Sequence, residues 1–226
     1  VAVPTTSGTG SEVGRASVIT DAQEHVKRLI FHPKMLPEIV ILDAKLTAPL
    51  PAHLTAATGM DALSHALEAY CAPYYHPMAE GIALEAIRLV KNYLPRACIN
   101  GDDLEARAQV MVSSTIGATA FQRGLGGMHA LAHPLGATYN SHHGLLNAIL
   151  MPYVLQANRE AIEQRITRLA QYIELENPSF DSFLTWVVEL KKELKIPHSL
   201  AEIGINLERA ADIGTMAFND PSAGGN

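Results

Sequence analysis

Residues 59–70 have the sequence GMDALSHALEAY and lie in the middle of a long apolar run. Apolar side chains recur in this run at helical spacing, which predicts a helix over residues 52–71. Asp61 and His65 are four positions apart, so the helix places both side chains on one face. Buried acids and imidazoles need polar partners. These two side chains can satisfy one another or share a metal ion, and their spacing leaves both interpretations open.

The residues on either side of this helix divide the chain into two parts. Residues 1–49 contain short β-branched runs and turns, which predict strands at 16–20, 27–31 and 38–43. Residues 50–226 have helical periodicity almost throughout. We therefore expect a mainly α protein, with a few β-strands before an all-helical domain. The predicted helices span 52–71, 78–93, 103–118, 125–136, 142–158, 160–174, 179–194 and 206–217.

The composition excludes several classes of protein. The 226 residues are 48% hydrophobic and 18% charged, which is typical of a folded globular chain. The formal net charge is −6 and there is no basic run, so nucleic acid and anionic membranes are poor partners. No apolar run approaches the ~18 residues of a membrane span. The chain has two cysteines, Cys71 and Cys98, which cannot form a disulfide framework and favour a reducing compartment such as the cytoplasm.

The two ends of the sequence indicate a piece of a longer protein. The chain starts at Val1 in a strand-like run without a methionine or a signal peptide. It stops within residues 219–226, NDPSAGGN, which resemble an unfinished loop.

A second polar cluster lies in residues 127–144, GMHALAHPLGATYNSHHG. His129 and His133 are four positions apart and share a helix face, and His143 follows after a short loop. Any one of these histidines alone is explained as a helix cap or a satisfied core residue. Together with the acid and imidazole of the first helix, they offer one carboxylate and three imidazoles.

Such a donor set suits a divalent ion such as Fe(II) or Zn(II). The proposed set is Asp61, His65, His129 and His143. The absence of cysteine ligands argues against a structural zinc site. His133 lies one turn beyond His129, where it can be near the ion without binding it.

A glycine-rich loop occupies residues 4–12, PTTSGTGSE. Its glycine spacing differs from the G-x-G-x-x-G dinucleotide fingerprint, so a tight turn is one interpretation. The density of hydroxyl groups favours a second interpretation, in which the loop contacts a phosphate, a ribose or a nicotinamide amide.

The loop 4–12, the helix segment 59–68 and the segment 129–136 (HALAHPLG) resemble, in this order, the signatures of the iron-containing (group III) alcohol dehydrogenases. The resemblance extends along nearly the whole chain. It implies the helical C-terminal metal-binding domain of the dehydroquinate synthase-like fold at residues 50–226. Residues 1–49 would then be the remnant of an N-terminal α/β dinucleotide-binding domain, whose pyrophosphate loop this chain does not contain.

The resemblance also implies roles for individual residues. The metal ligands would be Asp61, His65, His129 and His143, and His133 would lie near the nicotinamide and the substrate. The cofactor-contacting positions would be Thr5, Thr6, Thr9 and Lys27. The implied cofactors are NAD or NADP and a divalent metal, for which Fe2+ is expected in preference to Zn2+. The implied assembly is a homo-oligomer. The chain departs from the family pattern at residues 121–127, a segment that is one residue shorter than in better-known members. Because this segment leads to the first histidine ligand, the wall of the substrate pocket can differ, and the resemblance does not identify the substrate.

The expected reaction is hydride transfer between a metal-bound alcohol, or its alcoholate, and NAD(P), with the reverse reduction of aldehydes and ketones. Two alternatives remain open at this point. One is a related polyol or hydroxy-acid dehydrogenase. The other, for this chain alone, is a non-catalytic metal-binding helical domain.

Overall fold

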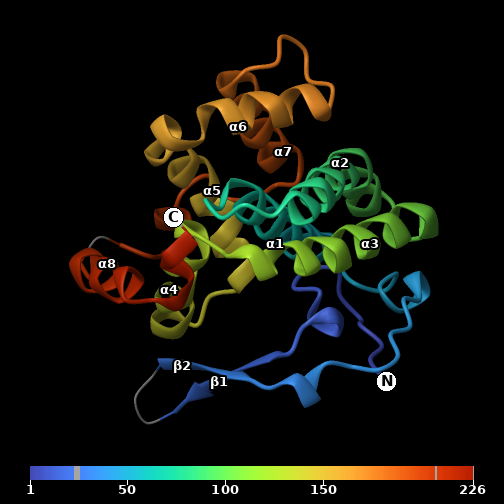
Figure 1. The fold of residues 1–226 in the computed structure, drawn as a ribbon, viewed down its shortest axis with the longest axis horizontal. Coiled ribbons are helices and arrows are strands. Elements are labelled where there is room, and N and C mark those ends of the chain that lie inside the picture. The colour runs from blue at the N-terminus through green and yellow to red at the C-terminus, as the bar shows by residue number, and fades with distance from the viewer. Residues whose placement is uncertain (23–25, 207, 226) are drawn as a thin grey trace.

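The computed structural model describes residues 1–22, 26–206 and 208–225, and within this part the chain is mainly α-helical (Figure 1). The α-helices are α1 (Ala52–Cys71), α2 (Pro77–Ile99), α3 (Leu104–Ala120), α4 (Gly127–Tyr139), α5 (His143–Ala157), α6 (Arg159–Tyr172), α7 (Phe180–Glu193) and α8 (Ala210–Phe218). The strands are β1 (Ala16–Asp21) and β2 (Val26–Phe31). The predicted fold class is confirmed, and α1 has the predicted bounds.

Helix α2 is longer than the predicted 78–93 and continues through Pro95 to Ile99. His76 caps its first turn, because its Nδ1 accepts a hydrogen bond from the Ala79 amide at 3.2 Å. Proline costs one intrahelical hydrogen bond and would ordinarily end a helix. Here the helix continues because Leu94 and Ala97, on either side of the proline, are buried in the core.

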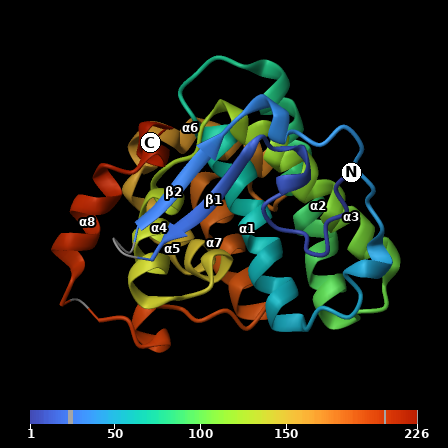
Figure 2. The same ribbon diagram turned by 90° about the horizontal axis from the view of Figure 1, so that it is seen from below.

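The first two predicted strands form an antiparallel hairpin, in which Ala16 pairs with Phe31 and Asp21 pairs with Val26. The hairpin lies below the helices, with β2 beside α4 (Figures 1 and 2). The predicted strand at 38–43 is wrong. In the described part of the chain this segment makes an isolated parallel bridge, between Ala2 and Val40, because no longer neighbour runs beside it to form a ladder.

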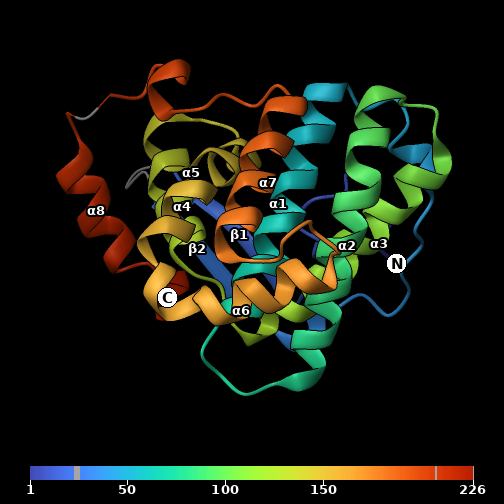
Figure 3. The ribbon, with the colours of Figure 1, turned by 90° about the horizontal axis from the view of Figure 1, so that it is seen from above.

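Helix α1 runs through the centre of the helical layer, with α2 and α3 on one side and α5 beside it (Figures 1 and 3). It is buried along nearly its whole length, from Thr55 to Tyr70. A helix with apolar residues all round its axis requires this central place. None of the described helices combines the length and the apolar character that crossing a bilayer requires.

The glycine-rich loop is docked on α3 rather than standing free. Gly10 has a φ of 64°, and a Cβ there would lie 2.4 Å from the Ala118 Cβ. The Ser114 hydroxyl donates to the Gly8 carbonyl at 2.9 Å. The loop ends in a short 3-10 helix, Ser11–Val13. Glycine is needed at position 10 because it alone combines the left-handed conformation with this close approach.

Candidate metal centre

Four of the predicted site residues converge between α1, α4 and α5. Helix α1 contributes Asp61 and His65, α4 contributes His129, and α5 begins with His143. The Nε2 atoms of His129 and His65 are 3.0 Å apart. The Asp61 Oδ1 lies 3.9 Å from the His129 Nε2 and 3.6 Å from the His143 Nε2. The first three side chains are buried, and that of His143 is 27% exposed.

The close approach of α5 to α1 depends on Gly144. A Cβ at this position would lie 2.3 Å from the Ala57 carbonyl oxygen and 3.0 Å from the Asp61 Cβ. The preceding His142 caps α5, because its Nδ1 accepts a hydrogen bond from the Leu145 amide at 3.3 Å. The cap starts the helix at His143, whose ring therefore projects toward α1. Of these two adjacent histidines, His142 therefore caps α5 and His143 faces the cluster.

The geometry disfavours the interpretation in which Asp61 and His65 satisfy one another. Their closest recorded approach, between His65 Nδ1 and Asp61 Oδ2, is 3.8 Å, which is too long for a hydrogen bond. Three buried polar atoms of the cluster have no hydrogen-bond partner among the described residues, namely His65 Nδ1, His143 Nδ1 and Asn147 Oδ1.

The ligand atoms have separations that fit an ion. Bonds of about 2.0–2.2 Å place neighbouring ligand atoms roughly 3.0–3.5 Å apart around a divalent metal. The observed separations of 3.0, 3.6 and 3.9 Å lie close to this range. The atoms of Asp61, His65 and His129 that could bind an ion all lie within 4.8 Å of one another.

The protonation states also suit a cation. Burial lowers the pKa of His65 to about 4 and that of His143 to about 3, so both imidazoles are neutral near pH 7. Burial raises the pKa of Asp61, but the adjacent His65, His143 and His129 outweigh it, and the net pKa is lowered. Burial lowers the pKa of His129, but the adjacent Glu68 and Asp61 outweigh it, and the net pKa is raised. An ionised carboxylate beside neutral imidazoles is the donor set that divalent first-row metals prefer, and Asp61, His65 and His143 fit it.

Two residues of the cluster were missed by the sequence analysis. Glu68 Oε2 lies 2.6 Å from His129 Nδ1. Asn147 Nδ2 donates to Asp61 Oδ1 at 2.8 Å and lies 3.2 Å from His143 Nε2. Helical spacing carries a signal for both, because Glu68 is three positions after His65 and Asn147 is four positions after His143.

His133 lies at the edge of this cluster. Its ring stacks on that of His143, with centroids 5.4 Å apart and an interplanar angle of 15°. Its Nδ1 is 2.9 Å from Asp220 Oδ2, a contact between residues 87 positions apart that no local pattern predicts. Burial raises the pKa of Asp220, but the contacts to His133 and Ser222 together outweigh it and the net pKa is lowered. The pair is therefore a charge-assisted hydrogen bond.

Of the four predicted cofactor-contacting residues, three lie on the glycine-rich loop and one lies in β2, whereas the four candidate ligands lie on α1, α4 and α5. Thr5, Thr6 and Thr9 have exposed side chains on the docked glycine-rich loop. Lys27 lies in β2, and its side chain is outside the described part of the structure. Their contacts with a nicotinamide cofactor stay a prediction.

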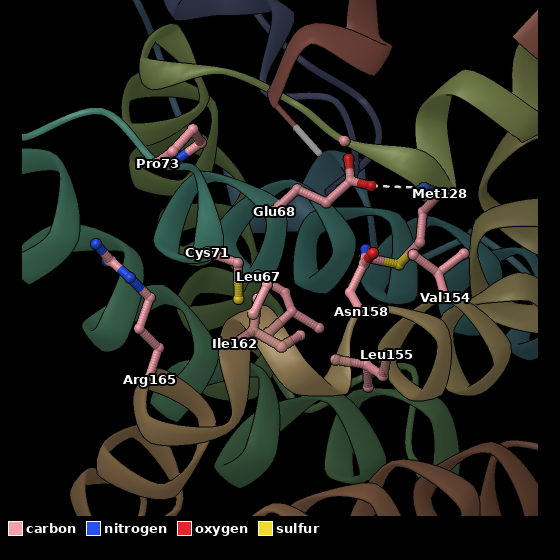
Figure 4. Close-up of a pocket in the computed structure, with 12 residues that line it drawn as sticks. Leu67, Glu68, Cys71, Pro73, Met128, Val154, Leu155, Asn158, Ile162 and Arg165 are labelled. Carbon is pink, nitrogen blue, oxygen red and sulfur yellow. Dashed lines mark hydrogen bonds between the residues drawn. The ribbon is translucent and has the colours of Figure 1, made fainter. Parts of the chain in front are cut away.

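A cavity of about 410 Å³ lies on the other side of Glu68, between α1, α4, α5 and α6 (Figure 4). Its walls are mainly apolar, and they include Leu67, Leu155 and Ile162. Cys71 also lines the cavity, and burial raises the pKa of its thiol to about 12, which makes it a poor nucleophile. None of the four candidate ligands lines this cavity.

The fold and the cluster define a helical protein with a candidate metal centre between three helices. Comparison with known families identifies it further. A family model described as "Fe-containing alcohol dehydrogenase family, C-terminal" matches residues 55–226, and one described as "Iron-containing alcohol dehydrogenase" matches residues 1–44. This chain belongs to the iron-containing alcohol dehydrogenase family, as its motifs predicted.

Individual relatives agree with this assignment. The chain is 41% identical over 215 residues to 4-hydroxybutyrate dehydrogenase of Cupriavidus necator, a match covering 91% of the chain and 55% of the relative. It is 37% identical over 228 residues to NAD-dependent methanol dehydrogenase of Bacillus methanolicus, covering 97% of the chain and 60% of the relative. A crystal structure of 1,3-propanediol oxidoreductase superposes with a TM-score of 0.95 at 35% identity, covering 100% of the chain and 61% of that structure. The chain thus spans between half and two thirds of the length of these relatives.

Proposed function

We propose that this chain carries the metal-binding part of an NAD(P)-linked alcohol dehydrogenase, which also reduces aldehydes or ketones. In this proposal Asp61, His65, His129 and His143 hold one divalent ion, Fe2+ before Zn2+. The observation that carries the proposal is the convergence of side chains from three helices on the Asp61 carboxylate. The Nε2 atoms of His129 and His65 are 3.0 Å apart, and the Asp61 Oδ1 lies 3.9 Å from the His129 Nε2 and 3.6 Å from the His143 Nε2.

When bound, the ion supplies Lewis acidity, which acidifies an alcohol and polarises a carbonyl group. Asp61 holds a negative charge at the site, which offsets that of the cation. His133 has its Nδ1 engaged by Asp220, so its Nε2 is the atom that can exchange a proton with the substrate hydroxyl. Stacking on His143 keeps this ring beside the centre.

The nicotinamide cofactor, NAD or NADP, would contact Thr5, Thr6, Thr9 and Lys27. The division into a cofactor-domain remnant at 1–49 and a catalytic helical domain at 50–226 is part of the same proposal, as are homo-oligomeric assembly and a reducing cytoplasmic environment. The free thiols of Cys71 and Cys98 support the last point.

A polyol or hydroxy-acid dehydrogenase is the second candidate. The similarity to a relative named 4-hydroxybutyrate dehydrogenase, at 41% identity, favours it. Turnover of a longer form of the protein on a panel of simple alcohols, diols and hydroxy acids separates the two. Activity confined to hydroxy acids would support the second candidate and exclude the first.

Metal content tests the ligand set directly on this chain. After reconstitution with Fe2+ or Zn2+ and removal of free metal, we expect about one ion per chain. Asp61→Ala and His143→Ala should lose the ion, whereas His133→Ala should keep it. Unchanged metal content in the first two variants would end the ligand assignment, and loss of metal in the third would make His133 a ligand.

A further inference from the structure

We infer that Glu68 is the positioning residue of the metal centre. Its carboxylate holds the His129 imidazole in one tautomer and one orientation, so that Nε2 faces the position of the ion. The inference rests on the proposed function, because the ion is part of that proposal.

Each carboxylate oxygen of Glu68 has its own partner on α4. Oε2 lies 2.6 Å from His129 Nδ1, and Oε1 accepts a hydrogen bond from the Met128 amide at 2.6 Å. Figure 4 shows Glu68 reaching from α1 to Met128. Both side chains of the Glu68–His129 pair are buried, with 5% and 1% exposure. Such short, buried contacts to a carboxylate are charge-assisted.

The contact to Nδ1 determines which nitrogen of His129 carries the proton. An ionised carboxylate can only accept hydrogen bonds, so Nδ1 must be the protonated atom. In the neutral form of the ring the lone pair is then on Nε2, which lies 3.0 Å from His65 Nε2, 3.2 Å from Asn147 Nδ2 and 3.9 Å from Asp61 Oδ1. A carboxylate behind a metal-bound histidine fixes its orientation in this way and increases its basicity.

The contact to Met128 fixes the helix that carries the histidine. Gly126, at the N-cap of α4, provides no side-chain hydrogen bond to the first turn. Glu68 supplies the missing acceptor from another helix, and its negative charge lies at the favourable end of the α4 dipole. One side chain therefore positions both the ring and the backbone that supports it.

The spacing on α1 completes the argument. Asp61, His65 and Glu68 lie at positions i, i+4 and i+7 of one helix and so share one face. The same face of α1 thus presents two candidate ligands and the group that orients a third. If Glu68 only capped α4, its contact to the Met128 amide would be sufficient. The second contact, to His129 Nδ1, indicates that Glu68 also orients the imidazole ring.

The experiment measures Co2+ binding to the chelator-treated chain by calorimetry and by the visible absorption of the bound ion. Glu68→Gln keeps the shape of the side chain but removes its charge. We expect the variant to bind Co2+ with a Kd about 10–100-fold higher than the wild-type chain. Ser113→Ala is the matched control, because it removes a buried hydrogen bond, to the Ala86 carbonyl, at a distance from the cluster. It should bind Co2+ as the wild type does.

A second readout separates positioning from a purely structural role. In the Co2+ form, the Nδ1 proton of His129 should give a shifted NMR signal that exchanges slowly with water. Glu68→Gln should shift this signal and accelerate its exchange. If Glu68→Gln does not fold, Glu68→Asp replaces it, since the shortened carboxylate cannot reach both partners, and the same loss of affinity is expected.

The outcomes distinguish the two claims. If the folded variant binds Co2+ within twofold of wild type and keeps the Nδ1 signal, Glu68 is only a helix cap and the inference is overturned while the proposed function stands. If the wild-type chain itself binds neither Co2+ nor Fe2+, the proposed function fails and the inference falls with it.

Discussion

Two buried polar clusters of this protein are built on opposite principles. The first cluster surrounds Arg107, which is 3% exposed. Its guanidinium group donates hydrogen bonds of 2.9 to 3.3 Å to the Thr55 hydroxyl and to the backbone carbonyls of Gly101, Ala48 and Leu50. It ties the start of α1 to α3 and the segment before α1. In the candidate metal centre, by contrast, the Nε2 atoms of His65 and His129 lie 3.0 Å apart, and the Asp61 carboxylate lies beside them.

The difference distinguishes a structural cluster from a candidate binding site. A buried guanidinium whose three nitrogens all donate to protein oxygens stabilises a junction and needs no added ligand. A buried cluster whose imidazole Nε2 lone pairs face each other beside a carboxylate is costly unless a cation lies between them. The first cluster should therefore respond to mutation with a loss of stability, and the second with a loss of metal.

Metal removal should have the largest effect. At a free ion concentration of about 1,000 times Kd, binding to the folded state alone adds ~4 kcal/mol to the free energy of unfolding. Urea unfolding with and without a chelator measures this difference. Asp61→Ala should show no difference between the two conditions, and a chelator-independent midpoint in the wild-type chain would contradict the prediction.

Replacement of Arg107 should come next. Arg107→Met leaves three backbone carbonyls without their donor, so we expect a loss of about 3 kcal/mol in the free energy of unfolding. The remaining folded protein should keep its full chelator response, because the centre is unaffected. Arg96→Met, at an exposed ion pair with Asp103 and Glu105, is the control and should leave the midpoint nearly unchanged. A loss of metal in Arg107→Met would contradict the prediction that this cluster contributes to stability and not to metal binding.

Another buried cation, the side chain of Lys191, sharpens the comparison through pH. Lys191 is 3% exposed, and its Nζ has one acceptor among the described residues, the Ile149 carbonyl at 3.3 Å. Burial lowers the pKa of Lys191 from 10.5 to about 8. Between these values the unfolded chain binds more protons, so the free energy of unfolding should rise with pH, by about 3 kcal/mol in total.

Urea midpoints measured from pH 8 to 10.5 test this slope. Lys191→Met should flatten it, because methionine keeps the apolar stem and does not titrate. An equal slope in both proteins would show that the lysine does not cause it.

The smallest effect is expected at Asn147. Its amide donates to Asp61 Oδ1 at 2.8 Å and so holds one carboxylate oxygen in place. Asn147→Ala should retain the ion but raise its Kd about tenfold, equivalent to ~1.4 kcal/mol. Calorimetric titration measures the change, with Ser113→Ala again as the control. Complete loss of metal would instead indicate that Asn147 itself is a ligand.

Much of the fold could be predicted from residue patterns because its signals are local. The periodicity of residues 52–71 identifies α1, and two β-branched runs identify the hairpin. The strand expected at 38–43 failed because strand formation depends on a neighbour, and Ala2 offers a single bridge. Proline at position 95 did not end α2, because the buried apolar face outweighed one lost hydrogen bond.

The candidate ligands were found in the same way, since residue type and helical spacing mark Asp61, His65 and His129 without reference to the rest of the fold. Their supporting partners were not found, because those contacts join residues far apart in the chain: 61 positions for Glu68 with His129, 86 for Asn147 with Asp61 and 87 for His133 with Asp220. The order of amino acids thus accounts for which helices form and which faces carry donors, since both depend on neighbours within a few turns. Which donors meet, and which atoms stay unpaired, depends on how closely the helices pack, as at Gly144, and that is a property of the assembled core.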